Sequence, residues 1–358
     1  MAFDAHIEDF QRLGLHHAAS LDGSDPFGAV RSMADFGRRF AQNRDSLPQT
    51  DEDRAFHLVS RATDLIDYQL PFAADAAAPG IIADARKLLE EALELDPTSC
   101  DAKRMLAAAD NPSFEDFYRF LADGAEDARR ASEKARDAVD LPEGDAHALA
   151  EDLSMHPYLR WLAVLAGQAL ECGHYRICVN TALELLKLDP TDQADVRLTL
   201  ALAYAKLEDP AGLEALMRRH PDGRGRHNPW YGLARLALAF KNRHFGQAER
   251  EVTALIAGHP HSGMTLARQD WLPDGVFSRI VVEPGSEDEL ILAVSEATVI
   301  LQEGCDSHER GALGSWLASR PEVQKANALD VASAPGQSAR AARPGPAEPG
   351  TDTRGNRS

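Results

Sequence analysis

Apolar residues recur at helical spacing along most of the chain, with short polar breaks between the runs. In the stretch HYRICVNTALELLKLDPTD, Tyr175 is followed by Cys178, Ala182 and Leu185, and Pro190 ends the run. Steps of three, four and three residues put these side chains on one face of a helix. Proline ends the run because it has no N–H to donate to the preceding turn. The pattern predicts an amphipathic helix that closes near Pro190.

The same pattern occurs elsewhere in the chain. Two further copies read IIADARKLLEEALELDPTS and HFGQAEREVTALIAGHPHS, and a shorter copy reads DPAGLEALMRRHPDG. The key positions of the last full copy lie 70 residues after those of HYRICVNTALELLKLDPTD, which is two repeats of about 35 residues. Each copy follows a partner segment with a helical pattern, such as ADVRLTLALAYAKLE. Helix pairs at this period predict an all-α solenoid, in which each pair buries an apolar face against the next.

The repeated segments resemble a tetratricopeptide-repeat (TPR) protein. The matching positions are the small residues Ala85, Cys178 and Ala248 and the closing prolines Pro97, Pro190 and Pro260. The resemblance implies a TPR-like α-solenoid of antiparallel helix pairs. Such an array forms a concave surface, lined mainly by the first helix of each pair, on which partner proteins bind.

Residues 156–262 also resemble a bacterial TPR-like group related to the suppression-of-tumorigenicity proteins. That group has a Pro-Tyr-x-Arg start to one helix pair, and a Pro-x-Asp joint followed by a hydrophobic residue and Arg. The matching residues are Pro157, Tyr158, Arg160, Pro190, Asp192, Val196 and Arg197. The joint departs from the group's Asn-rich, Gly-containing version at Thr191, Gln193 and Asp195.

The chain divides into six predicted parts. They are an N-terminal helical segment (1–50), a first TPR-like helix pair (51–111), a helical insert rich in acidic and basic residues (112–155), the TPR-like repeat array (156–262), a C-terminal capping region (263–327) and a disordered tail (328–358). The tail is rich in Pro and Gly, so it cannot bury enough apolar surface to offset the entropy of ordering. Within the capping region, VFSRIVV fits either a short strand or a loop.

Charge and composition exclude some classes of partner and indicate a cellular compartment. The net charge of −19 repels nucleic acid and anionic membranes, so neither is an expected partner. The start MAFDAHIEDF has neither the basic flank nor the apolar core of a secretory signal, and no apolar run reaches bilayer length. The four cysteines form no CxxC pair, which favours reduced thiols. We expect a cytoplasmic protein.

The sequence has no recognisable catalytic motif. It contains no phosphate loop, no G-x-S-x-G nucleophile turn and no H-E-x-x-H zinc pair. His259 and His261 flank Pro260 and could chelate a metal, but no third ligand lies at a convincing spacing. We therefore expect no enzyme activity, no cofactor and no metal site.

One stretch goes against the acidic background. Between residues 210 and 250 there are eight basic and three acidic residues, which gives +5. This basic stretch could receive an acidic peptide, pair with the acidic faces of the 112–153 segment, or lie in solvated loops. It also supports an alternative function, a regulatory module that binds a small ligand or nucleic acid through residues 210–250.

Counting back from the closing prolines of 34-residue units predicts which residues face the groove. The predicted partner-binding residues are Arg160, Arg197, Tyr204, Trp230 and Phe240. Arginine and aromatic side chains are common interface anchors, and arginine can hold a carboxylate with two hydrogen bonds. Other roles remain open: ion pairs with Asp152 or Asp195 for the arginines, and core packing for the aromatics. The main prediction is a non-catalytic scaffold for an unidentified partner protein, with an acidic peptide segment as one candidate.

Overall fold

In the computed structural model the described residues are helical, which confirms the all-α part of the predicted fold class. The structure describes residues 3–21, 26–70, 73–74, 76–111, 113–221, 228–270, 282–304 and 310–333. These residues form helices α1 to α17 joined by short loops, and no strand occurs among them. Within the same ranges, no helix combines the length and the apolar character needed to cross a bilayer.

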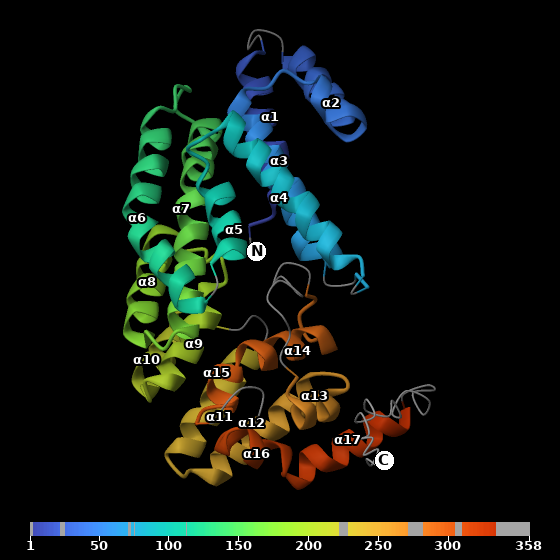
Figure 1. The fold of residues 1–358 in the computed structure, drawn as a ribbon, viewed down its shortest axis with the longest axis vertical. Coiled ribbons are helices and arrows are strands. Elements are labelled where there is room, and N and C mark those ends of the chain that lie inside the picture. The colour runs from blue at the N-terminus through green and yellow to red at the C-terminus, as the bar shows by residue number, and fades with distance from the viewer. Residues whose placement is uncertain are drawn as a thin grey trace, which may run out of the picture.

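The helices run from one end of the molecule to the other in approximate chain order, with α1–α4 at one end and α11–α17 at the opposite end (Figure 1). Their bounds are α1 (Ala5–Ala19), α2 (Pro26–Asn43), α3 (Asp51–Thr63), α4 (Ala78–Leu95), α5 (Cys100–Asp110), α6 (Phe114–Asp137), α7 (Asp145–Glu171), α8 (Tyr175–Leu188), α9 (Val196–Lys206), α10 (Pro210–Arg219), α11 (Pro229–Lys241), α12 (Phe245–Gly258), α13 (Ser262–Arg268), α14 (Glu287–Glu296), α15 (Thr298–Leu301), α16 (Ala312–Ala318) and α17 (Pro321–Ser333). A 3₁₀ turn, η1 (Arg44–Ser46), precedes α3, and a π-helix, η2 (Asp64–Gln69), continues it.

The apolar stripes predicted from the repeats are buried. The stripe residues are Ala85, Leu89 and Ala92 on α4, Cys178, Ala182 and Leu185 on α8, and Ala248, Val252 and Leu255 on α12. Each of these helices packs against the helix that precedes it in the chain, α3, α7 and α11 respectively. The three- and four-residue spacing therefore marks the inner face of each pair.

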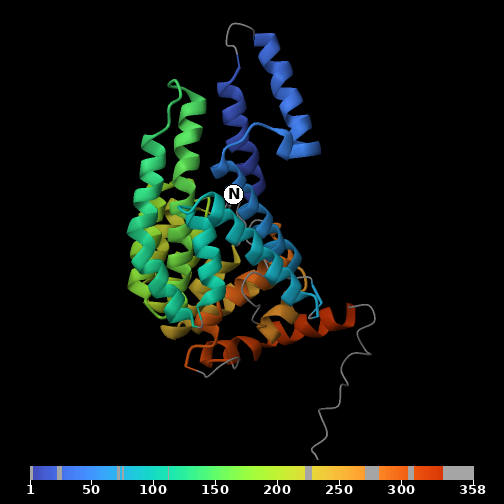
Figure 2. The same cartoon turned by 45° about the horizontal axis from the view of Figure 1, so that its top comes forward.

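Helix α7 is continuous from Asp145 to Glu171 although it contains Pro157. A proline inside a helix leaves the carbonyl four residues earlier without its usual N–H donor. Here Arg12, on α1, donates from Nη2 to the Leu153 carbonyl at 3.1 Å. The predicted boundary between the insert and the repeat array, at residue 155, therefore falls within one helix. Helices α6 and α7 lie side by side as a long hairpin (Figure 2).

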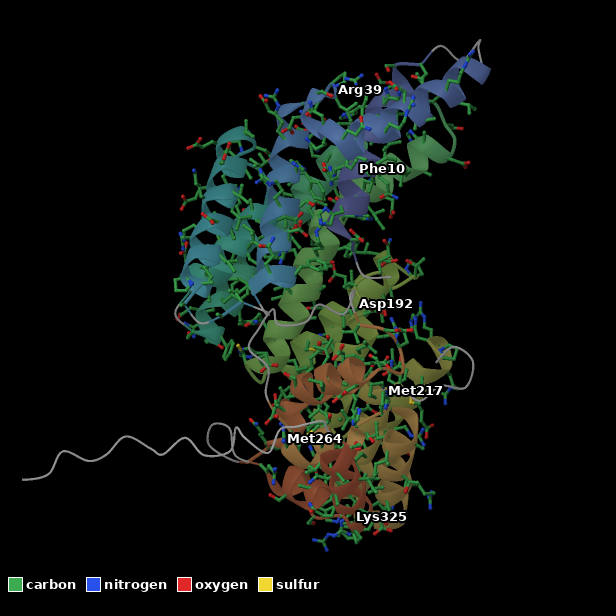
Figure 3. All side chains as sticks on the ribbon, turned by 90° about the vertical axis from the view of Figure 1, so that its right-hand side faces the viewer. Phe10, Arg39, Asp192, Met217, Met264 and Lys325 are labelled. Carbon is green, nitrogen blue, oxygen red and sulfur yellow. The ribbon has the colours of Figure 1, made fainter. Side chains whose placement is uncertain are left out.

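The interior consists of separate hydrophobic clusters. A large cluster includes buried residues of α6 to α12 and of the C-terminal helices, a small one joins α3, α4 and α5, and a third joins α1 and α2. The side-chain view places Phe10 and Arg39 near the α1–α2 end and Lys325 at the other end (Figure 3). The junction between the small α3–α5 cluster and the large cluster is the part of the fold that holds the site described below.

At the C-terminus, α17 extends to Ser333, so residues 328–333 of the predicted tail are helical. The rest of that tail, and all of the VFSRIVV segment except Val282, lie outside the described residues.

Candidate functional site

A cavity of about 920 Å³ lies where the α3–α5 cluster meets α6 and α7. Its wall is mainly apolar. The apolar side chains that line it include Phe3, Phe56, Val59, Ile66, Ile82, Leu89, Met105, Leu106, Phe114, Phe117 and Val164. The polar or charged ones are His6, Thr63, Asp67, Tyr68, Arg86, Asp101, Arg104, Asn111, Ser113, Arg160 and Gln168. An apolar cavity with a few inward polar groups is the usual form of a ligand site.

The π-helix η2 shapes one wall. It follows α3 directly, and its three consecutive residues Ile66, Asp67 and Tyr68 all line the cavity. A π-turn has an extra residue per turn, which shifts the face that the following residues present, and such turns are frequent at functional sites. Asp67, four residues after Thr63, continues the wall that α3 lines with Phe56, Val59 and Thr63, and its neighbours Ile66 and Tyr68 on the wider turn line the cavity as well.

Asp67 is the unusual group in this wall. Burial raises the pKa of its carboxyl to about 6, with Arg104 opposing the shift and Asp64 adding to it. In the part of the chain that the structure describes, no group donates a hydrogen bond to this carboxylate. A partly buried carboxyl with a perturbed pKa in a cavity is a marker of a functional site.

An ionic network forms the floor of the cavity. The Arg160 guanidinium donates to Asp101 through Nε (2.9 Å) and Nη2 (2.5 Å), and to Glu8 Oε2 through Nη1 (2.6 Å). Glu8 also accepts from Arg12 at 2.7 Å and lies 2.9 Å from Nδ1 of His156. Burial alone would raise the pKa of Glu8, but Arg160, Arg12 and His156 together hold it well below its usual value. The network fixes α1, α5 and α7 relative to one another.

Two buried polar atoms near the cavity have no hydrogen-bond partner within the described ranges. They are Nε of Arg104, on α5, and Oε1 of Gln168, on α7. Arg104 is otherwise held by Asp101, to which its Nη2 donates at 3.2 Å. Leaving a buried donor or acceptor unpaired costs about 1–3 kcal/mol. Both residues line the cavity, so a bound molecule could supply the missing partners.

Ser60, His6 and Asp64 have the residue types of a hydrolytic triad. Ser60 Oγ lies 3.4 Å from His6 Nδ1, and His6 Nε2 lies 2.8 Å from Asp64 Oδ1. Ser60 is only 1% exposed, however, and does not line the cavity. A nucleophile must reach a reacting atom about 3 Å away. These contacts therefore attach α1 to α3 and η2 and do not form a catalytic centre.

Of the five predicted groove residues, Arg160 is the one that lines the cavity. Its ion pairs are with Glu8 and Asp101, and not with Asp152. Arg197 forms an ion pair with Asp195, which was one of the alternatives left open by the sequence, and a second ion pair with Asp192 at 2.7 Å. In doing so it ties the start of α9 to the turn before it.

The three predicted aromatic residues lie on α9 and α11. Tyr204 is buried, and its ring packs so closely on Gly212 that a Cβ there would lie 2.5 Å from it. Trp230 is 3% exposed and donates from Nε1 to Glu296 at 2.7 Å. Phe240 is half-buried, with its ring centroid 5.4 Å from that of Trp316. None of the three lines the cavity, and partner binding by them stays a prediction.

The basic stretch is partly paired within the chain. Arg235 lies 2.5 Å from Glu251, and Lys241 lies 2.9 Å from Glu303. Among the described residues no ion pair joins the stretch to the 112–153 segment, while Arg224 and Arg226 lie outside them. The described residues also contain no group of three or more His, Cys, Asp or Glu side chains placed to hold a metal. His259, one of the two histidines considered for this role, is buried with Nε2 3.3 Å from Glu289.

The cavity residues other than Arg160 were missed in the sequence, although a signal was present. Asp67 continues the apolar stripe of α3 at Phe56, Val59 and Thr63, where another apolar residue is expected. Gln168 lies seven residues after the buried Trp161 and interrupts a stripe in the same way. Polar residues at positions where the spacing predicts buried apolar ones were the signal in the sequence that indicated a cavity.

Known proteins do not identify this chain further. No protein-family model, no curated protein and no solved structure matches it.

Proposed function

We propose that this chain is a non-catalytic scaffold of TPR-like helix pairs that binds a segment of a partner protein in the cavity between α3–α5 and α6–α7. The observation that carries the proposal is the cavity itself. Its volume of about 920 Å³ is at the upper end of the range for bound ligands. Its wall is mainly apolar, and the buried Arg104 Nε and Gln168 Oε1 lack partners within the described residues.

The contacts between helices support the solenoid arrangement. Helix α9 contacts both α7 and α11, and α11 in turn contacts α14. Contact between successive first helices is what the stacking of TPR-like pairs requires. The α3–α4 pair has its own core and meets the array through α5 and α7. The cavity lies at this junction, where the regular stacking is interrupted.

The charges around the cavity favour binding over catalysis. Arg160 and Asp101 hold each other, and His6, which lines the cavity, is paired with Asp64, which does not. The other perturbed carboxyl of the wall is Asp101, whose pKa Arg160 lowers against the effect of burial. Both of its oxygens accept hydrogen bonds from Arg160, so it is not available as a second acid or base beside Asp67. The alternative function, through the basic stretch, has less support because Arg235 and Lys241 are held in ion pairs.

The proposal is tested with a substitution that fills the cavity and does not disturb the core. Ala108 lines the cavity but is solvent-exposed on α5, so Ala108→Trp should occupy the space and leave the fold intact. Lys103→Trp adds the same side chain at an exposed position of the same helix that does not line the cavity. We expect proteins co-purified with the wild type and with Lys103→Trp, quantified by mass spectrometry, to be lost from Ala108→Trp.

Two results would contradict the proposal. If Ala108→Trp retains every co-purified protein, the cavity is not the binding site. If those proteins are instead lost when the Trp230 side chain is truncated in Trp230→Phe, with circular dichroism unchanged, the groove predicted from the sequence is the site.

A further inference from the structure

The charged residues of the cavity wall differ in whether they are already paired. Arg160 and Arg104 are held by Asp101, Arg86 is paired with Asp110, and His6 with Asp64. These groups come from α1, α4, α5 and α7, whereas α6 contributes the apolar Phe114 and Phe117 to the lining. Asp67 is the charged group in this wall without an ion pair in the described residues, and Arg104 is the cation close enough to act on it.

The unpaired polar atoms specify what a ligand must offer. Asp67 lines the cavity, and no described residue donates to its carboxylate, while Gln168 Oε1 and Arg104 Nε are buried without partners among the described residues. The first two groups need hydrogen-bond donors, and Arg104 Nε needs one acceptor. A fatty acid or a phosphate ester offers acceptors to Arg104 but no N–H donors for the other two groups. A peptide offers a backbone N–H and a backbone carbonyl together, and a lysine or arginine side chain adds charged donors.

Burial makes the Asp67 carboxylate sensitive to a cation. A carboxylate without a partner in an apolar wall is destabilised by the loss of water, and an incoming ammonium or guanidinium group restores the lost interaction. The apolar remainder of the wall needs apolar side chains on either side of that charge.

We propose that the segment bound in the cavity carries a lysine or arginine flanked by apolar residues, and that Asp67 receives its positive charge. This rests on the proposed function, because it specifies the chemistry of the segment that the cavity binds. It also differs from the acidic segment considered from the sequence, since the arginines of the wall already hold carboxylates of this chain.

The proposed contact makes binding depend on pH. The pKa of Asp67 is raised to about 6, so its carboxyl loses its charge as the pH falls through that value. Binding of a basic segment should weaken at about pH 5 relative to about pH 7.5. The binding of a neutral apolar segment should weaken much less over the same pH change.

The experiment uses three pools of short peptides that share randomised apolar flanks and differ only at the central residue, which is lysine, norleucine or glutamate. Each pool is passed over the immobilised full chain, and the retained peptides are quantified by mass spectrometry. We expect the lysine pool to be retained roughly tenfold or more above the norleucine pool at about pH 7.5, from the usual strength of charged hydrogen bonds. Asp67→Asn should remove that difference and leave norleucine retention unchanged.

The matched control is Asp64→Asn. It removes the same charge one turn away, from a residue that pairs with His6 and does not line the cavity. This variant should keep the preference for lysine. The Ala108→Trp variant should lose retention of all three pools, which places the bound peptides in the cavity.

The outcomes separate this inference from the proposed function. If norleucine and lysine pools are retained equally, and Asp67→Asn changes neither, the cavity binds peptides but the basic anchor is wrong. Preferential retention of the glutamate pool would also overturn the inference and make Arg104 the anchor. If no pool is retained above the level of Ala108→Trp, both the inference and the proposed function fail.

Discussion

Two contrasting kinds of charged residue lie in and beside the cavity. Glu8, Asp101 and Arg160 form a network in which every partner is satisfied, so each charge is stabilised. Asp67 has no such partner among the residues that the structure describes, and burial raises its pKa to about 6. A satisfied network supports the fold, whereas a group that destabilises the empty protein is typical of a binding site.

The first prediction concerns the network. Arg160→Leu leaves Glu8 and Asp101 buried without their main partner, so it should lower the free energy of unfolding by about 3–5 kcal/mol. Urea denaturation at neutral pH measures the effect. Arg130→Leu removes an arginine that is paired with Glu126 on the exposed surface, and it should cause no measurable loss. Equal stability of the two variants would show that the network is not structural.

The second prediction concerns Asp67 in the absence of a ligand. The pKa of Asp67 in the folded protein is raised above the unfolded value of about 3.8. Its favourable contribution to the free energy of unfolding is therefore present at low pH and is lost as the pH rises to about 6. Asp67→Asn should therefore stabilise the protein at about pH 7.5, by about 1–3 kcal/mol, and by much less at about pH 4. Denaturation at both pH values checks this. A variant less stable than wild type at about pH 7.5 would mean that Asp67 has a partner in the fold.

Helix α1 packs against α7 and also supplies a hydrogen-bond donor that α7 lacks. Pro157 removes one N–H donor from the middle of α7, and Arg12 supplies a donor to the Leu153 carbonyl from outside the helix. The same arginine pairs with Glu8, one turn earlier on α1. The continuity of α7 and the position of α1 are thus linked through one side chain.

The third prediction follows from this link. Arg12→Met should lower the free energy of unfolding by about 1–3 kcal/mol, because it leaves the Leu153 carbonyl without a donor. In a Pro157→Ala background the cost should be smaller, since Ala at this position restores the N–H. A double-mutant cycle by denaturation measures the coupling. Strictly additive effects would show that the hydrogen bond to Leu153 does not contribute.

Most of the helices follow from local spacing in the sequence. The stripes of α4, α8 and α12 were predictable because neighbours three and four residues apart share a helix face wherever the helix packs. The π-helix η2 was not, because DLIDYQ has no spacing that distinguishes a π-turn from an α-helix. The continuity of α7 was missed for a different reason: the donor to Leu153 comes from Arg12, 141 residues away.

At the scale of the whole molecule, the cavity results from two hydrophobic cores that meet without merging. Helix α5 contributes Ala102 to the small cluster and Ala107 to the large one, and the ionic network of Glu8, Asp101 and Arg160 lies at the same junction. Arg160 and Glu8 are 152 residues apart in the chain. Periodicity cannot predict such contacts, so the sequence predicted Arg160 as an interface residue without its partners, and did not predict the cavity.

Site-specific photo-crosslinking would show whether a partner segment lies in this cavity. A photoreactive phenylalanine analogue replaces Ala109, which lines the cavity, or Lys103, an exposed residue of the same helix that does not. After irradiation of the native cells, mass spectrometry identifies the crosslinked peptide. We predict an adduct from position 109, to a segment with a basic residue among apolar ones, and none to that segment from position 103. An adduct to the same segment from both positions would show that the crosslink is not specific to the cavity. An adduct from position 240 on α11, with none from 109 or 103, would place the segment in the predicted groove and not in the cavity.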